Sequence, residues 1–103
     1  MVRFALLSDV HVTAHGVVPA RLSAVVAALR ALGPRFVVLS GDMTSGNQGD
    51  GCDLGRVRSW WQQLEGALAP LRDAGIALLP IAGNHDYYTD AHRRAFAEAA
   101  PRL

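Results

Sequence analysis

Three short apolar runs in this chain each end in side chains of the kinds that bind metal ions. The runs occupy residues 4–8, 36–40 and 77–82. The side chains that follow them are, in chain order, those of Asp9 and His11, then Asp42, then Asn84, His85 and Asp86. Short apolar runs separated by helical patterns are typical of buried strands in a parallel sheet. Because parallel strands present their carboxyl ends at one edge of a sheet, we expect the three groups of side chains to meet there.

The stretches between the runs have the spacing of amphipathic helices. Leucines and valines from 22 to 32 fall on one face of a first helix, which Gly33-Pro34 ends. A second helix is expected over 55–74, although Pro70 should kink or split it because proline cannot donate a helical hydrogen bond. A third helix is expected over 91–100.

The order of these elements predicts an α/β fold, a β-α-β-α-β-α unit with a mainly parallel sheet, in one small domain over 1–103. Pro80 is unusual inside a central strand, so the third strand is expected to lie at an edge or to be irregular. Thr89 or Asp90 is expected to cap the third helix. The expected strands cover 3–8, 36–40 and 76–82.

Composition limits the functions that the chain can have. Its 103 residues are half apolar, enough for one small core. Its ten basic residues are all arginine, are scattered, and are nearly balanced by nine acidic ones, so it lacks the basic stripe of a nucleic-acid-binding protein. No stretch approaches the roughly 18–20 apolar residues that span a membrane, and no secretory pattern opens the chain. A cytoplasmic location and no membrane partner are therefore expected.

The residue types at the predicted sheet edge favour a particular class of metal. Asp9 and His11 are two apart, so in an extended chain both side chains point the same way and can bind one ion. Asp42 follows Gly41, which allows the backbone to turn past the strand end, and its two oxygens could bridge two ions. A mixture of aspartate, histidine and asparagine favours Mn²⁺, Fe or Zn²⁺ over an oxygen-only calcium site.

The third group consists of consecutive residues, which cannot easily all bind the same ion. A division of roles is therefore expected, in which Asn84 binds metal, His85 takes part in the chemistry and Asp86 orients or charges His85. The alternative is that the aspartates and the asparagine cap turns and helices, but capping does not explain His11 and His85.

Several other polar or aromatic residues have simpler explanations than a place in the site. His15 is expected to be a solvated loop residue and His92 a surface residue of the third helix. Trp60-Trp61 could stack on bases, but their helical spacing favours packing in the core. The glycine-rich stretch 45–53 is expected to be a flexible loop. Tyr87-Tyr88 either line a substrate pocket or have a packing role.

Three blocks of this sequence resemble the first three signature blocks of the calcineurin-like metallophosphoesterases, in the family's order and with a helix between each. They are Asp9-x-His11, Gly41-Asp42 and Gly83-Asn84-His85-Asp86. Any one block is a common pattern, whereas three in order at strand ends are highly specific. The first and third blocks also resemble those of small bacterial branches, including cyclic-nucleotide phosphodiesterase-like members.

The resemblance implies hydrolysis of phosphoesters by two divalent metal ions and a metal-bridging hydroxide nucleophile. The substrates would be phosphomonoesters or phosphodiesters, with nucleotides among the candidates and nucleic acid only as a substrate. It also implies a role for each residue: Asp9 and His11 bind the first metal, Asp42 bridges both, Asn84 binds the second metal and contacts the phosphate, His85 is the catalytic histidine, and Asp86 is its partner.

The family's later blocks, a Gly-His pair and a Gly-His-x-His unit, have no counterpart here, where His15 and His92 are the only other histidines. The chain therefore resembles the N-terminal part of a metallophosphoesterase domain, the first part of an αββα sandwich. Two alternatives stay open. The chain is an active phosphoesterase that completes its site by self-association, or it is a catalytically incomplete subunit that binds metal weakly and needs a complementary half.

Overall fold

Three parallel strands alternate with helices in the computed structural model, which describes residues 2–12, 20–44, 54–83 and 89–103. The predicted α/β class and the order of elements are confirmed, and the ends of the elements for which we gave both bounds differ from the predicted ones by no more than two residues. The elements are β1 (Phe4–Leu7), α1 (Ala20–Leu32), β2 (Phe36–Leu39), α2 (Leu54–Asp73), β3 (Ala77–Pro80), α3 (Asp90–Ala99) and the 3₁₀ turn η2 (Ala100–Arg102).

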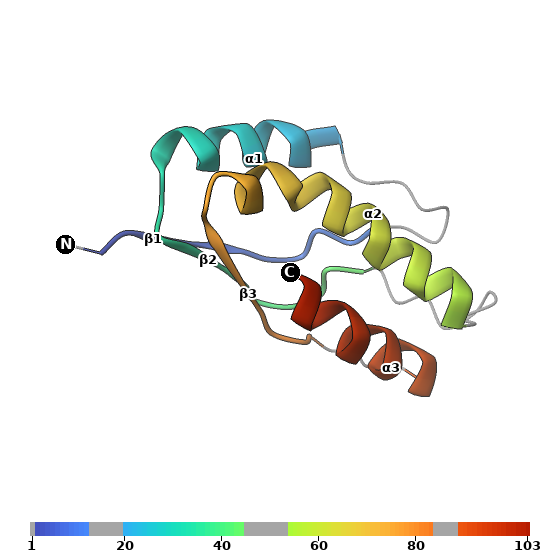
Figure 1. Cartoon of the computed structure of the whole chain (residues 1–103). Helices are drawn as coiled ribbons and strands as arrows, with labels where there is room; N and C mark the ends of the chain where they lie inside the picture. Colours follow the sequence, from blue (N-terminus) through green and yellow to red (C-terminus); the bar gives the residue numbers. More distant parts are fainter. Residues whose placement is uncertain (1, 13–19, 45–53, 84–88) are drawn as a thin grey trace.

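The strands form one sheet in the order β1-β2-β3, and both pairs are parallel (Figure 1). Phe36 at the start of β2 pairs with Phe4 of β1 and with Ala77 of β3, so the three strands begin and end at the same level. β3 lies at an edge of this sheet with Pro80 as its last residue, as predicted from the proline. The carboxyl ends of all three strands consequently lie together.

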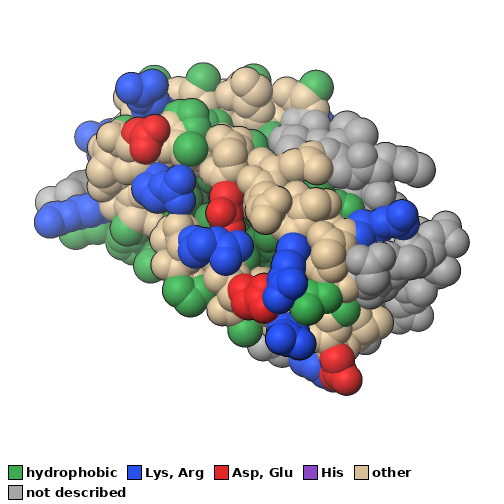
Figure 2. All heavy atoms as spheres, turned by 45° about the vertical axis from the view of Figure 1, so that its right-hand side comes forward, with side chains coloured by type: hydrophobic (Ala, Val, Ile, Leu, Met, Phe, Trp, Pro, Cys, Tyr) green, Lys and Arg blue, Asp and Glu red, His purple; other side chains and the backbone are tan. Residues whose placement is uncertain are grey.

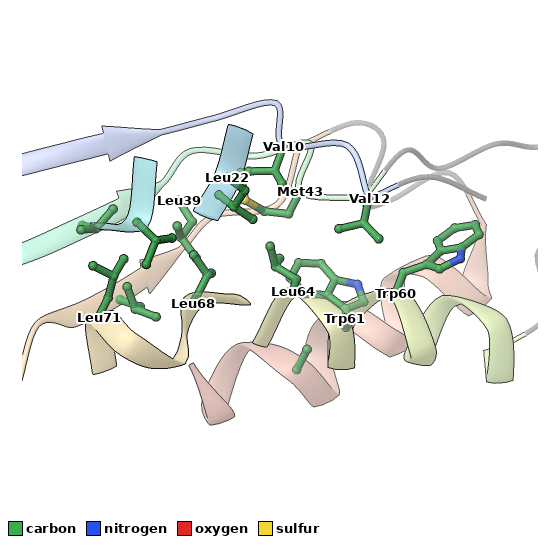
Figure 3. Close-up of a cluster of buried hydrophobic side chains, with 14 of the residues drawn as sticks. Val10, Val12, Leu22, Leu39, Met43, Trp60, Trp61, Leu64, Leu68 and Leu71 are labelled. Atoms are coloured by element: carbon green, nitrogen blue, oxygen red, sulfur yellow. The ribbon is translucent and has the colours of Figure 1, made fainter. Parts of the chain in front are cut away.

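The helices cover one face of the sheet, with α2 between α1 and α3 (Figures 1 and 3). Val37, Leu39 and Leu78 point from the sheet into this core and are buried. α2 supplies the largest share of the buried side chains, and its two tryptophans are among them, which confirms their predicted packing role (Figure 3). The buried residues of α2 are Val57, Trp60, Trp61, Leu64, Leu68 and Leu71.

The opposite face of the sheet is apolar and exposed. Phe4 and Leu6 of β1 are 57% and 66% exposed, and Leu79 and Ile81 at β3 are also exposed. Phe4 stacks on Phe36 with ring centroids 5.2 Å apart. Parallel sheets normally have both faces covered, so this face is an incomplete layer in the described part of the chain.

α2 runs without a break from Leu54 to Asp73, so the predicted split at Pro70 is wrong. The missing N–H removes a single hydrogen bond in the last turn of the helix. Leu68 and Leu71, on either side of the proline, are fully buried in the core and hold the backbone on its helical path.

A charged pair ties α2 to α3. Nε and Nη2 of Arg58 each donate to a carboxylate oxygen of Glu98 at 2.7 Å. This bidentate contact holds the pKa of the Glu98 carboxyl below its usual value. On the face shown in Figure 2, arginine and acidic side chains are interspersed, which agrees with the absence of a basic stripe from the sequence.

Candidate metal centre

The chain segments that leave β1 and β2 stay paired beyond the sheet. Ser40 first continues the ladder by donating its N–H to the Leu7 carbonyl at 2.9 Å. The two segments end in an isolated parallel bridge between Val12 and Thr44. Between these points, three N–H groups of the first segment donate to carbonyls of the second: Asp9 to Gly41 at 3.1 Å, His11 to Asp42 at 3.2 Å and Val12 to Met43 at 3.0 Å.

Asp9, His11 and Asp42 all have left-handed backbone conformations, with φ of 55°, 54° and 54°. The prediction that Asp9 and His11 lie in an extended chain is therefore wrong. Among the described residues, these are the non-glycine positions with positive φ. Non-glycine residues with this conformation are uncommon, and each destabilises the folded state by about 1 kcal/mol. They cluster at functional sites, where contacts with the surrounding structure keep the backbone in this conformation.

The three side chains nevertheless converge, as expected from their places at the strand ends. Nε2 of His11 lies 3.2 Å from Oδ1 of Asp9, and one ligand atom from each of the three residues lies within 4.8 Å of the others. Two donors bound about 2.1 Å from one ion at tetrahedral or octahedral angles are roughly 3.0–3.4 Å apart. The Asp9–His11 pair already has the spacing of two ligands of one divalent ion, and Asp42 lies near enough to be the third ligand after a shift of its side chain.

The side chain of Ser8 favours the ionised form of Asp9, which is the form that binds metal. Its hydroxyl donates to Oδ2 of Asp9 at 2.6 Å. This hydrogen bond, followed by the one with His11, lowers the pKa of the Asp9 carboxyl below its usual value. The carboxylate is the form that binds metal, so Ser8 favours the ligand state. We did not predict this contact, although the Ser-Asp pair at the end of the first run was visible in the sequence.

The segment after β3 passes directly against Asp42. A Cβ added to Gly83 would overlap Oδ1 of Asp42 and lie 2.9 Å from its Cγ. Gly41, with φ of 111°, makes the matching approach, because a Cβ there would lie 2.8 Å from the Gly83 Cα. Only glycine fits at these two crossings, so the third segment joins the same cluster.

Gly83→Ala is expected to weaken metal binding about 10–100-fold, because the new methyl group must displace the Asp42 carboxylate. Isothermal titration with Mn²⁺ measures this change. Gly66→Ala is the matched control, since a Cβ at that helical position meets nothing within 4 Å. It should leave metal affinity unchanged. Wild-type affinity in Gly83→Ala would mean that the close approach has no part in the site.

The other predicted site residues, Asn84, His85 and Asp86, lie outside the described residues, as do His15, Tyr87-Tyr88 and the stretch 45–53.

The prediction that His92 lies at the surface is wrong, because the residue is fully buried. It shares one face of α3 with Ala95 and Ala99, and this face packs on α2. The burial of His92 could have been predicted from the sequence, because His92 lies three residues before Ala95 and therefore on the same face of the helix.

Comparisons with known proteins match the chain to one family. A family model described as calcineurin-like phosphoesterase matches residues 2–102 of the chain. A comparison with curated proteins found no match. Among the described residues, no helix has both the length and the apolar character needed to cross a membrane.

Proposed function

The chain belongs to the calcineurin-like phosphoesterase family, and on that premise we propose that it carries the metal-binding edge of a divalent-metal-dependent phosphoester hydrolase. The observation that supports this most is the convergence of Asp9, His11 and Asp42 at the carboxyl ends of two neighbouring strands. Three neighbouring residues with left-handed backbones lower the stability of the fold. A need to bring three metal ligands together explains why they are present.

In this proposal Asp9 and His11 hold one ion, and Asp42 is shared with a second ion that Asn84 also binds. The placement of Gly83 against Asp42 supports it, because Asn84 is the next residue along the chain. Mn²⁺, Fe and Zn²⁺ are the candidates for both ions. A bound pair would activate water for attack at neutral pH and would neutralise charge on the phosphoryl group.

The remaining steps belong to protein side chains. Ser8 keeps Asp9 ionised and fixes one of its oxygens. We propose that His85 protonates the leaving oxygen of a phosphomonoester or phosphodiester, nucleotides included, and that Asp86 orients His85. The cyclic-nucleotide branch and a cytoplasmic location stay predictions from the sequence.

His85→Ala is expected to lower kcat about 100-fold or more while metal stays bound, because it removes a general acid but no ligand. The measurement is Mn²⁺-dependent hydrolysis of an aryl phosphodiester and an aryl phosphomonoester, with bound Mn²⁺ counted in parallel. Gln63→Ala, at an exposed position of α2, serves as the control and should behave like the wild type. Full activity in His85→Ala, or loss of Mn²⁺ from it, would contradict the assigned role.

The exposed apolar face of the sheet favours a second candidate, a catalytically incomplete subunit that needs a complementary half. In that case a further sheet covers Phe4, Leu6, Leu79 and Ile81 and brings additional metal ligands. The folded chain would then bind Mn²⁺ weakly and hydrolyse neither substrate by itself. The hydrolysis assay above distinguishes the two candidates.

A further inference from the structure

The two carboxylate oxygens of Asp9 have different partners. Oδ2 accepts a hydrogen bond from the hydroxyl of Ser8 at 2.6 Å. Oδ1 lies 3.2 Å from Nε2 of His11, which is the neighbouring ligand atom of the proposed site. The hydrogen bond and the proposed pair of ligands therefore use opposite oxygens of one carboxylate.

Ser8 is placed to fix the rotation of this carboxylate. The backbone of Asp9 is already set by its φ of 55° and by the hydrogen bond from its N–H to the Gly41 carbonyl at 3.1 Å. The side chain of Asp9 is 63% exposed, so packing against neighbours does not hold the plane of its carboxylate. A hydrogen bond from a hydroxyl to an ionised oxygen is short and strong, and the contact from Ser8 has the length of such a bond.

The number of oxygens that a carboxylate gives to one ion affects which ion a site prefers. Ca²⁺ takes about six to eight oxygen ligands and readily accepts both oxygens of one carboxylate. Zn²⁺ is smaller and is usually bound by four ligands, so one carboxylate oxygen beside a histidine nitrogen suits it. While Oδ2 stays bonded to Ser8, Asp9 offers a single oxygen to the ion.

We propose that Ser8 is a specificity-determining residue, whose hydroxyl keeps Oδ2 of Asp9 away from the ion. Asp9 then binds through Oδ1 alone, and the site favours Mn²⁺, Fe or Zn²⁺ over Ca²⁺ more strongly than the nitrogen of His11 would make it do. This inference rests on the proposed function, because it assumes an ion bound by Asp9, His11 and Asp42. An aspartate carboxyl with an ordinary pKa is also ionised at neutral pH, so a comparison at neutral pH reports the placement of the oxygens.

The test compares the affinities for Mn²⁺ and Ca²⁺ in the wild type and in Ser8→Ala, by isothermal titration at neutral pH. Ser8 is exposed, so its truncation leaves the core intact. Loss of a hydrogen bond to a metal ligand should weaken Mn²⁺ binding about 10–100-fold. Ca²⁺ gains the released oxygen, so its affinity should hold or rise. The ratio of Mn²⁺ affinity to Ca²⁺ affinity should therefore fall at least about 10-fold, and effects common to both ions cancel in this ratio.

Two further variants control for the loss of a hydroxyl as such. Ser8→Thr keeps a hydroxyl at this position and should keep the wild-type ratio. Ser59→Ala removes another exposed hydroxyl, which donates to the Arg56 carbonyl of α2 at 2.8 Å, and it should change neither affinity.

Crystals soaked in metal give a second measurement, which is independent of affinity. In the wild type with Mn²⁺, Oδ1 of Asp9 should lie about 2.0–2.2 Å from the ion. Oδ2 should stay bonded to Ser8 and outside bonding distance of the ion. In Ser8→Ala with Ca²⁺, both oxygens of Asp9 should lie about 2.3–2.6 Å from the ion.

The results that would overturn the inference differ from those that would overturn the proposed function. An unchanged affinity ratio in Ser8→Ala, or both oxygens of Asp9 bound to Mn²⁺ in the wild type, would show that Ser8 does not set how Asp9 binds. Absence of metal from Asp9, His11 and Asp42 in the wild type would contradict the metal centre itself.

Discussion

Asp42→Ala is expected to abolish binding of the metal pair. Its ligand atom lies within 4.8 Å of those of Asp9 and His11, and in the proposed site it is the ligand shared by the two ions. The alanine variant should also be slightly less stable, by about 1 kcal/mol, because Asp42 has φ of 54° and alanine tolerates that conformation less well than aspartate. Titration calorimetry with Mn²⁺ and thermal unfolding measure the two effects separately.

Asp42→Asn is the matched comparison for this prediction. Asparagine keeps the shape of the side chain and is among the residues that adopt a left-handed backbone most readily. It removes the charge and one of the two ligand oxygens, so it should lose the metal pair that Asp42 is proposed to bridge, while unfolding like the wild type. Wild-type Mn²⁺ stoichiometry in either variant would rule out the bridging role.

Trp61→Ala is expected to lower the free energy of unfolding by about 3–5 kcal/mol. Trp61 is fully buried between α2 and the rest of the core, and its ring meets Phe96 of α3 edge-on with centroids 5.6 Å apart. A domain of this size is stable by only about 5–15 kcal/mol, so the loss would remove a large fraction of its stability. Urea unfolding followed by circular dichroism measures the change.

Trp61→Phe provides the control, and its outcome distinguishes packing from polarity. In the described part of the chain, Nε1 of Trp61 has no hydrogen-bond acceptor, and a buried donor without a partner costs about 1–3 kcal/mol. Phenylalanine leaves a smaller void and removes that donor, so we expect it to be far closer to the wild type than alanine. A loss as large as that of alanine would show that the core needs the whole indole ring and does not tolerate a smaller aromatic side chain.

Much of the fold could be predicted because each local signal agreed with the next. Apolar runs of strand length, helical spacing between them and Gly33-Pro34 after the first helix all pointed to the same β-α-β-α-β-α order. The convergence of Asp9, His11 and Asp42 followed from that topology, since parallel strands end at one edge.

The remaining features depend on contacts between distant segments, which a local pattern does not contain. The left-handed conformations of Asp9 and His11 arise where two segments stay paired beyond the sheet. The need for glycine at position 83 arises only when that segment crosses Asp42. The polarity of His92 favours the surface, whereas its position on the helix places it in the core, where it is buried. Pro70 was tolerated because the buried leucines around it outweigh one lost hydrogen bond.

The most direct test of the metal centre is anomalous X-ray scattering from crystals of the protein soaked in Mn²⁺ or Zn²⁺. The account predicts an anomalous peak about 2.0–2.2 Å from a carboxylate oxygen of Asp9, from Nε2 of His11 and from a carboxylate oxygen of Asp42. A metal peak that lies elsewhere, with these three side chains unligated, would contradict it.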